Sequence, residues 1–131
     1  MYLLDTNICI YCIKQKPVSV LQKLQQNMNN SIFISSITLA ELEFGVTKSQ
    51  FPEKNRISLI EFSSIFSILP FDDKDAEVYG KVRGNLTKQG NIIGQLDMLI
   101  GSQAVAKKLT LVTNNVREFE RIKDIRIENW V

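Results

Sequence analysis

Short apolar runs alternate along this chain with segments whose apolar residues recur at helical spacing. The first run, residues 2–4, stops at Asp5, and Thr6 and Asn7, both good helix caps, precede the next apolar segment. Further β-rich runs lie at residues 31–36, 66–71, 110–113 and 125–127, the last expected at a sheet edge. Strands that alternate with helices usually form a parallel sheet covered on both faces. We therefore expect an α/β fold with a mostly parallel central sheet flanked by helices.

The helices between these runs follow from caps, prolines and apolar spacing. They are expected at about residues 7–14, 18–26, 37–47, 53–62, 73–89, 95–107 and 116–121. Gly90 is placed to end the fifth of them. Because 131 residues is an ordinary length for one domain and no repeat, linker or low-complexity tract divides the chain, we expect residues 1–131 to form a single domain.

Composition excludes several classes of protein. The chain has no histidine, so Ser-His-Asp and Cys-His hydrolysis, paired-histidine cleavage of RNA and His-ligated zinc are all ruled out. A net charge of +2 gives no strong overall attraction to nucleic acid. No apolar run approaches the ~20 residues needed to cross a bilayer, and Asp5 comes too early for a secretory leader. We therefore expect a cytoplasmic protein with no membrane association.

The two cysteines form the pattern Cys9-x-x-Cys12 at the apolar start of the first helix. This spacing is compatible with a redox pair, but the chain has no other Cys or His to complete a zinc site. Two buried thiols packing as small hydrophobes are the favoured interpretation.

Three carboxylates stand out because apolar residues surround them, whereas acids such as Asp75 are expected on solvated helix faces. Asp5 follows an apolar strand and would serve as a helix N-cap, although Thr6 and Asn7 can also cap. Asp97 would lie in the first turn of its helix, where the macrodipole favours an acid. A buried acid without a partner is costly, so a shared partner is the alternative explanation.

Glu41 has its own structural alternative. Thr38-x-x-Glu41 fits a capping box, but Ser35 and Ser36 compete as caps and would place Glu41 one turn further into the helix. In a parallel sheet, junctions between strands and helices share one edge, where ligands bind. Three carboxylates there would repel one another unless a cation neutralised them, and oxygen-only ligands select Mg²⁺ or Mn²⁺. This is the chemistry of phosphodiester hydrolysis.

Four blocks of sequence resemble a known family. The opening residues 4–7 (Leu-Asp-Thr-Asn) are similar to the start of PIN-domain nucleases, and more narrowly of the VapC-type toxins of bacterial toxin–antitoxin pairs. The resemblance continues through residues 35–45, 94–100 and 111–119, in order and over nearly the whole chain. It implies a PIN-like fold and a Mg²⁺-dependent endoribonuclease in which Mn²⁺ can substitute.

The resemblance also implies site residues. Asp5, Glu41 and Asp97 match the family's three acidic positions. Many PIN domains have a fourth acid two residues after a threonine that ends a strand, and here Asn115 stands at that place. Asn115 could hydrogen-bond a metal-bound water but brings no charge, and Glu118, one turn on, is a candidate replacement. This departure favours one metal ion over two.

The mechanism that follows is a hypothesis. Asp5 and Asp97 would hold Mg²⁺ directly or through water, and Glu41 would orient or deprotonate the attacking water or complete the metal shell. No 2′-hydroxyl is needed, so any RNA preference would come from shape and loop recognition. Candidate phosphate contacts are Lys14, Lys16, Lys48, Lys54, Arg83, Lys88 and Arg117.

The resemblance implies partners as well. They are a small cognate antitoxin similar to VapB, whose tail covers the acidic pocket, and an RNA substrate such as the anticodon loop of tRNA. A homodimer within the toxin–antitoxin complex is expected, with operator DNA bound only through the antitoxin.

Two other functions are compatible with the residues. A phosphatase or phosphotransferase could use Asp5 as a nucleophile, although such sites usually have a second acid two residues on, where this chain has Asn7. A binding module could use its acids only to dock a partner's arginines. Tyr79, Phe44 and Trp130 could belong either to the core or to an interface.

Overall fold

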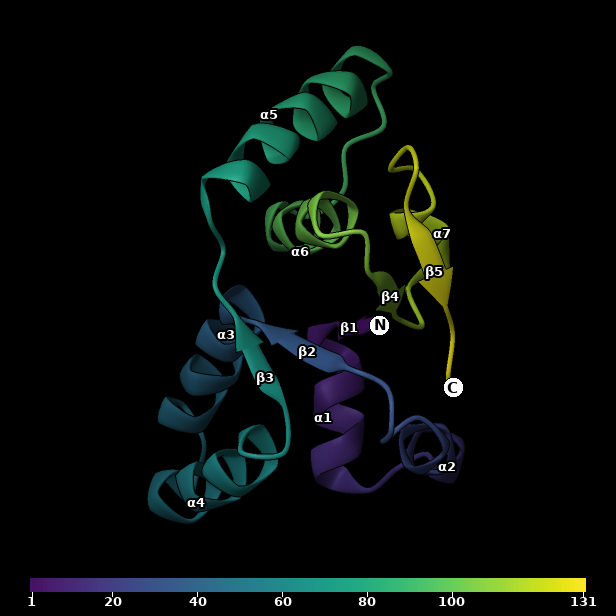
Figure 1. Ribbon diagram of the computed structural model, residues 1–131. Helices are drawn as coiled ribbons and strands as arrows, with labels where there is room; N and C mark the ends of the chain where they lie inside the picture. Colours follow the sequence, from purple (N-terminus) through teal and green to yellow (C-terminus); the bar gives the residue numbers. More distant parts are fainter.

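A five-stranded, wholly parallel sheet forms the centre of the molecule (Figure 1). The computed structural model describes residues 1–131. The strands are β1 (Tyr2–Leu4), β2 (Ile32–Ser35), β3 (Ser67–Leu69), β4 (Thr110–Val112) and β5 (Arg126–Glu128). Their order across the sheet is β3-β2-β1-β4-β5. The chain thus builds outward from β1 in one direction, then returns to add β4 and β5 on its other side.

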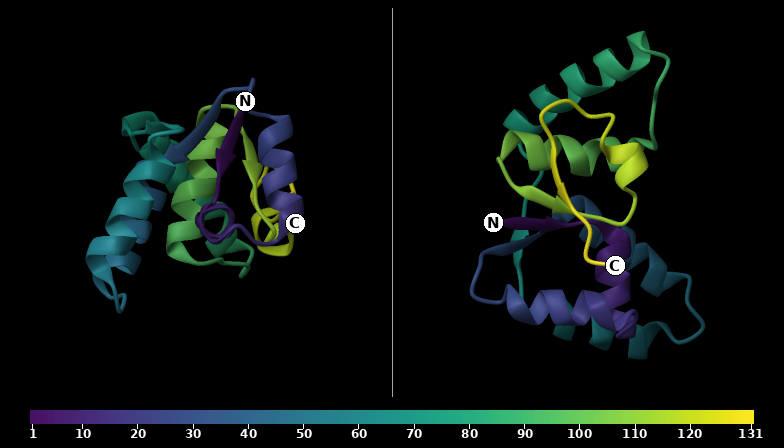
Figure 2. Two further views of the ribbon diagram at one scale, coloured as in Figure 1. Left: turned by 90° about the horizontal axis from the view of Figure 1, so that it is seen from below. Right: turned by 90° about the vertical axis from the view of Figure 1, so that its right-hand side faces the viewer.

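Seven helices cover the two faces of this sheet. They are α1 (Thr6–Lys14), α2 (Val18–Gln26), α3 (Ser36–Thr47), α4 (Pro52–Ser63), α5 (Asp73–Lys88), α6 (Gln95–Ala106) and α7 (Val116–Phe119). Figure 2 shows α1 to α4 on one side of the strands and α5 to α7 on the other. The α/β fold with a parallel sheet between helices is therefore confirmed, and none of its helices is long and apolar enough to span a bilayer.

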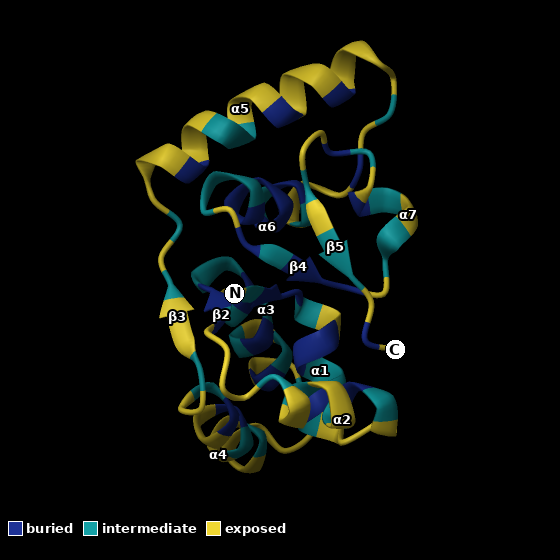
Figure 3. Cartoon of the chain, turned by 45° about the vertical axis from the view of Figure 1, so that its right-hand side comes forward, coloured by how far each residue is buried: buried dark blue, intermediate teal, exposed yellow.

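The two faces of the sheet carry separate hydrophobic cores because successive strand residues point to opposite sides. Leu4, Ile34 and Val112 pack with α1 to α4, whereas Leu3 and Leu111 pack with α5 to α7. Figure 3 shows the buried residues of the long helix α5 on the side that faces α6. Each core contains more than ten buried apolar residues, so the short strands are held by packing on both faces.

The predicted cysteine environment is confirmed. Cys9 and Cys12 are free, buried thiols in the core beneath α1. Burial is the main cause that raises the pKa of Cys12 to about 11, which keeps it protonated and unreactive near neutral pH.

Element boundaries follow the predicted signals closely. Helix α2 has the predicted bounds, and Pro52 is the first residue of α4. Gly90, with φ +64°, follows the end of α5 in a left-handed conformation, and the amide of Asn91 donates to the carbonyl of Leu86. The largest shift is in the third strand, which is three residues long because Pro70 and Phe71 leave the ladder.

The prediction that Asp75 lies on a solvated helix face is wrong. Asp75 is fully buried, forms a reciprocal capping box with Asp72 and accepts a hydrogen bond from the Gln103 side chain at 3.2 Å. Its other oxygen lies 3.3 Å from Lys107 Nζ. These contacts connect the start of α5 to the end of α6. Gln103 and Lys107 lie about thirty residues after Asp75 in the sequence.

Phe44, Tyr79 and Trp130, which the sequence alone did not assign to the core or to an interface, have different environments. Trp130 belongs to the core, where its indole N–H donates to Glu128 at 2.8 Å. Tyr79 is half-buried against the core under α5, whereas the side chain of Phe44 is 64% exposed.

Candidate active site

The site lies where the strand order reverses, between β1 and β4, at the carboxyl edge of the sheet. The register pairs Leu4 with Ile34 on one side and with Val112 on the other. The next residue of each strand is therefore Asp5, Ser35 or Thr113, and all three are buried in a row. A reversal of strand order in a parallel sheet opens a crevice at this edge, which is where such folds bind ligands.

Asp5 is fixed by two hydrogen bonds. Its Oδ1 accepts from the backbone N–H of Ile8 at 2.9 Å, and its Oδ2 accepts from the hydroxyl of Thr113. The N-cap of α1 is thus Asp5, which confirms its interpretation as a cap, and Thr6 and Asn7 lie within the helix. The cap holds the carboxylate at the helix N-terminus, where the macrodipole favours its negative charge.

Glu41 projects from the second turn of α3 toward the start of α1. Ser35 is the N-cap of α3, so the capping-box interpretation of Thr38 and Glu41 is wrong. Glu41 instead accepts a hydrogen bond of 2.7 Å from the hydroxyl of Thr6, the residue next to Asp5. Thr6 Oγ1 also lies 3.2 Å from Thr38 Oγ1, and these hydroxyls orient the Glu41 side chain.

Asp97 lies in the first turn of α6, as predicted. The N-cap of this helix is Gly94, which has no side chain, and a Cβ added there would lie 3.6 Å from Asp97 Oδ2. This is ordinary van der Waals distance, so the start of α6 lies directly beside the carboxylate of Asp97.

Electrostatics show that these acids share one environment. Burial is the largest cause that raises the pKa of Asp5 from 3.8 to about 6, with further contributions from the charges of Asp97 and Glu41. The pKa of Asp97 is raised as well, by burial first and then by the charges of Glu118 and Glu41. The carboxylates of three helices and of the α1 N-cap thus repel one another at this edge, which is an arrangement that a cation would relieve.

Asn115 and Glu118 enter the site from the connection after β4. The backbone N–H of Asn115 donates to Thr113 Oγ1 at 2.9 Å, and its side-chain amide donates to Glu118 at 3.2 Å. The structure thus brings Glu118, and not only Asn115, toward the carboxylate of Asp97.

The carboxylates lie near one another but do not form a closed set of metal ligands. No three Asp, Glu or Cys side chains converge closely enough to hold a metal ion by direct contact alone. Hydrogen bonds account for part of this spacing, because Asp5 is turned toward Thr113 and Glu41 toward Thr6. Mg²⁺ binds through one or two carboxylates and keeps several waters, so such spacing suits it.

Thr113 and Thr6 are the site residues that sequence reasoning missed. In the sequence, Thr113 only marks the end of a strand and Thr6 is only a possible helix cap. In the structure, the hydroxyl of Thr113 donates to Asp5 and that of Thr6 donates to Glu41. The available signal was register: a polar residue that ends β4 directly beside β1 must neighbour Asp5.

A groove adjoins the carboxylates between α1, α3 and α6. It is lined by Thr6, Asn7, Ile10, Ile37, Ala40, Glu41, Leu42, Phe44, Lys48 and Leu96. Of the seven basic residues proposed as phosphate contacts, only Lys48 lines it.

Comparison with known proteins identifies the family. Residues 2–125 match the PIN domain family. The chain is 45% identical over 130 residues to Ribonuclease VapC2 of Haemophilus influenzae, covering 99% of this chain and 98% of that protein. It is 43% identical to the tRNA(fMet)-specific endonuclease VapC of Shigella flexneri, covering 98% and 97%. The fold matches a crystal structure of VapBC2 from Rickettsia felis bound to a DNA fragment from their promoter, with TM-score 0.94, 46% identity and coverage of 99% and 98%. The chain therefore belongs to the PIN-domain family and, within it, to the VapC ribonucleases.

Proposed function

We propose that this chain is the toxin of a toxin–antitoxin pair, a Mg²⁺-dependent endoribonuclease that cleaves structured RNA, such as a loop of tRNA, with a metal-activated water. The observation that carries the proposal is that burial, and after it the charges of neighbouring acids that include Glu41, raise the pKa values of Asp5 and Asp97 at the carboxyl edge where the strand order reverses. The names of similar proteins, a VapC ribonuclease and a tRNA(fMet)-specific endonuclease, support the substrate class. We also propose that residues 1–131 form one PIN domain.

The donor set fits a hard divalent cation. Every candidate ligand is an oxygen, and burial together with the charges of neighbouring acids raises the pKa values of Asp5 and Asp97, so a cation would stabilise their ionised forms. Asp5 and Asp97 would hold Mg²⁺, or Mn²⁺ in its place, with Glu41 as a third ligand, and Asn115 and Glu118 would reach it through water. When bound, the ion lowers the pKa of a water and stabilises charge that develops on a phosphate oxygen.

The protein's own groups have distinct roles in this mechanism. Thr113 keeps Asp5 oriented by donating to one of its oxygens, and Thr6 does the same for Glu41. Glu41 is partly exposed beside the groove, so it can orient the attacking water or accept its proton. Because hydrolysis by water needs no 2′-hydroxyl, discrimination for RNA rests on shape and on unpaired bases.

The partners follow from the same relatives. A solved VapBC complex bound to promoter DNA supports a cognate antitoxin that contacts operator DNA. We propose that this chain binds such an antitoxin, forms a homodimer in that complex, contacts the DNA only through the antitoxin and acts in the cytoplasm, where tRNA is found.

The test is cleavage of purified tRNA by the purified protein, followed on denaturing gels. Asp97→Asn keeps the size of the side chain but removes its charge, and it should abolish cleavage, as should removal of divalent metal. Asp124→Asn, at an exposed aspartate in a turn outside the site, is the matched control and should cleave like the wild type. Cleavage that persists in excess EDTA would remove the metal from the mechanism.

Expression in cells separates the toxin from an inert binding module. A catalytic toxin should stop growth when expressed without an antitoxin, and Glu41→Ala should relieve the arrest. The phosphatase alternative is disfavoured because Asp5 is only 4% exposed, which gives a phosphate ester little access to its carboxylate. Asn7 also cannot supply the second acid.

A further inference from the structure

One face of α3 carries three chemically different side chains in succession. Glu41 and Phe44 in α3 and Lys48 at its C-cap follow at intervals of three and four residues, which places them on one stripe. All three line the groove that adjoins the carboxylates. At about 1.5 Å of rise per residue, the stripe leads from the acidic site to a cation about 10 Å away along the helix.

Phe44 is not needed by the core. The buried face of α3 is formed by Thr38, Leu42 and Val46, whereas the ring of Phe44 is 64% exposed. Lys48 Nζ lies 5.1 Å from the centroid of this ring, on the groove side of the helix. An exposed aromatic ring can stack with a flat group, and the neighbouring cation can contact a negative charge on the same ligand.

Lys48 is also free to meet an anion. The nearby Arg56 is paired with Glu43 at 2.7 Å, and no carboxylate lies within ion-pair distance of Lys48. Leu96 and Ile37 form apolar walls of the same groove. The groove therefore offers an aromatic face, apolar walls and one unpaired positive charge next to the proposed cleavage centre.

We propose that Phe44 and Lys48 form a subsite for an unpaired nucleotide next to the scissile phosphate. The base stacks on the Phe44 ring and a neighbouring phosphate contacts Lys48. This inference rests on the proposed ribonuclease function and specifies how that site takes a looped RNA. Base stacking on aromatic rings combined with phosphate contacts is the usual mode of binding single-stranded RNA, and a paired base could not reach the ring in this way.

An RNA strand with its metal ion fits the charges at both ends of the groove. The carboxylates at one end of the groove require a ligand that arrives with a cation, and the lysine at the other end requires an anion. A phosphodiester chain with its metal ion meets both requirements, because successive phosphates are separated by bases that can stack.

The experiment compares variants of the full-length protein in cleavage of one tRNA at several salt concentrations. Phe44→Ala should lower kcat/KM by roughly 5- to 100-fold, the range that one stacked base contributes, mainly through KM. Phe44→Tyr should retain activity because it keeps the ring. Lys48→Ala should weaken RNA binding and reduce the salt dependence of log K by about one phosphate contact.

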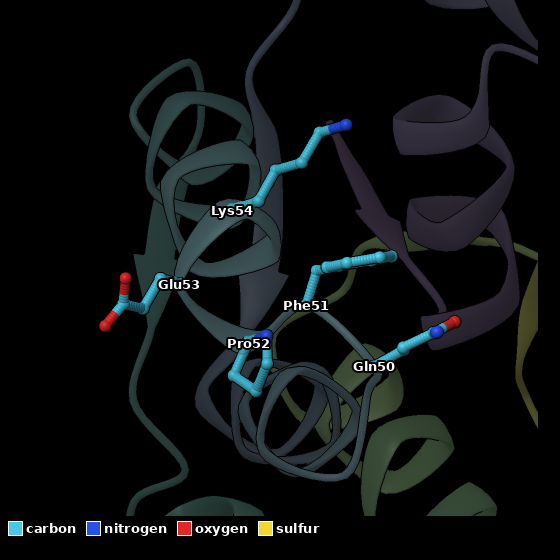
Figure 4. A pocket seen from close by; sticks show the side chains of 5 residues that line it. All are labelled: Gln50, Phe51, Pro52, Glu53 and Lys54. Atoms are coloured by element: carbon cyan, nitrogen blue, oxygen red, sulfur yellow. The ribbon is translucent and has the colours of Figure 1, made fainter.

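Phe51, in the connection between α3 and α4, supplies a matched control for Phe44. Figure 4 shows Phe51 and Lys54 around a shallow depression that they line together with Gln50, Pro52 and Glu53. Phe51 is 60% exposed, close to the value for Phe44, but this depression contains no residue of the acidic site. Phe51→Ala should therefore leave kcat/KM unchanged.

Three outcomes would overturn the subsite. If the wild-type protein cleaves tRNA and Phe44→Ala cleaves it equally well, the subsite is wrong while the ribonuclease function stands. If Phe44→Ala loses activity together with a change in oligomeric state, measured by light scattering, or loses only antitoxin binding, Phe44 belongs to a protein interface. If the wild-type protein does not cleave any RNA, the proposed function fails and the subsite fails with it.

Discussion

Replacing Asp5 by Asn should stabilise the metal-free protein at neutral pH while abolishing its activity. Burial raises the pKa of Asp5 from 3.8 to about 6 in the folded protein. At 1.36 kcal/mol per pKa unit, this difference corresponds to about 3 kcal/mol. Function thus places at the sheet edge a charge that the fold alone would not favour.

The sign of the pH dependence follows from where the proton binds more tightly. The folded protein holds the Asp5 proton more tightly than the unfolded chain, so the wild-type free energy of unfolding falls as the pH rises from about 4 to about 6. Above about pH 6 the titration of Asp5 has lowered the free energy of unfolding by its full amount, about 3 kcal/mol. The Asn variant lacks the titrating group, so the difference in stability between variant and wild type should grow by that amount over this range.

The substitution preserves the local contacts, which makes the comparison clean. Asn is as good an N-cap as Asp, so its carbonyl can still accept from the N–H of Ile8. Its amide can donate to Thr113 Oγ1, which reverses the direction of that hydrogen bond and releases the Thr113 hydroxyl hydrogen from its present acceptor. The charge is therefore the main change.

The assay is urea unfolding in EDTA at a series of pH values. Asp124→Asn, an exposed control, should show a constant difference from the wild type. Excess Mg²⁺ at pH 7 should then stabilise the wild type, by about 2.7 kcal/mol at 100 times its Kd, but not Asp5→Asn. A difference that does not change with pH, or a wild type that is the more stable protein at pH 7, would refute the desolvated-carboxylate argument.

Two further predictions concern packing and buried charge, both measured by urea or thermal unfolding. A Cβ at Gly101 would lie 2.5 Å from the nearest side-chain atom, so Gly101→Ala should destabilise the protein by about 1–3 kcal/mol. Gly84 has open space around it, so Gly84→Ala should stabilise the protein by up to about 1 kcal/mol. Equal effects of the two substitutions would contradict the close packing of α6. Lys107→Ala leaves the carboxylate of Asp75 buried without its cation and should cost about 3 kcal/mol, whereas Lys81→Ala breaks only an exposed pair and should cost less than about 1 kcal/mol; similar losses would show that the buried pair contributes no more than the exposed one.

The fold could be predicted from the sequence because its signals are local. Apolar runs of strand length, caps and prolines specify where each element begins and ends, and the alternation of elements specifies a parallel sheet. The position of Asp5 at the end of β1 follows from the same reasoning, since an apolar strand that stops at an acid puts that acid at the carboxyl edge.

The hydrogen bonds that hold the site could not be predicted in this way. Thr113 lies 108 residues from Asp5, and Thr6 lies 35 residues from Glu41, so each contact exists only after the strands have paired in register. The burial of Asp75 was missed for the same reason, because Gln103 lies 28 residues away. Long-range pairs of this kind leave no periodic signal in the sequence.

We propose that Asp5 and Asp97 bind one divalent ion at the carboxyl edge of the sheet, with Glu41 close by. The most direct measurement is the anomalous diffraction of Mn²⁺ in crystals of the wild-type protein and of Asp97→Asn. We predict one peak between the carboxylates of Asp5 and Asp97 in the wild type and its loss in the variant. A Mn²⁺ peak elsewhere on the protein, with none between these two carboxylates, would contradict it.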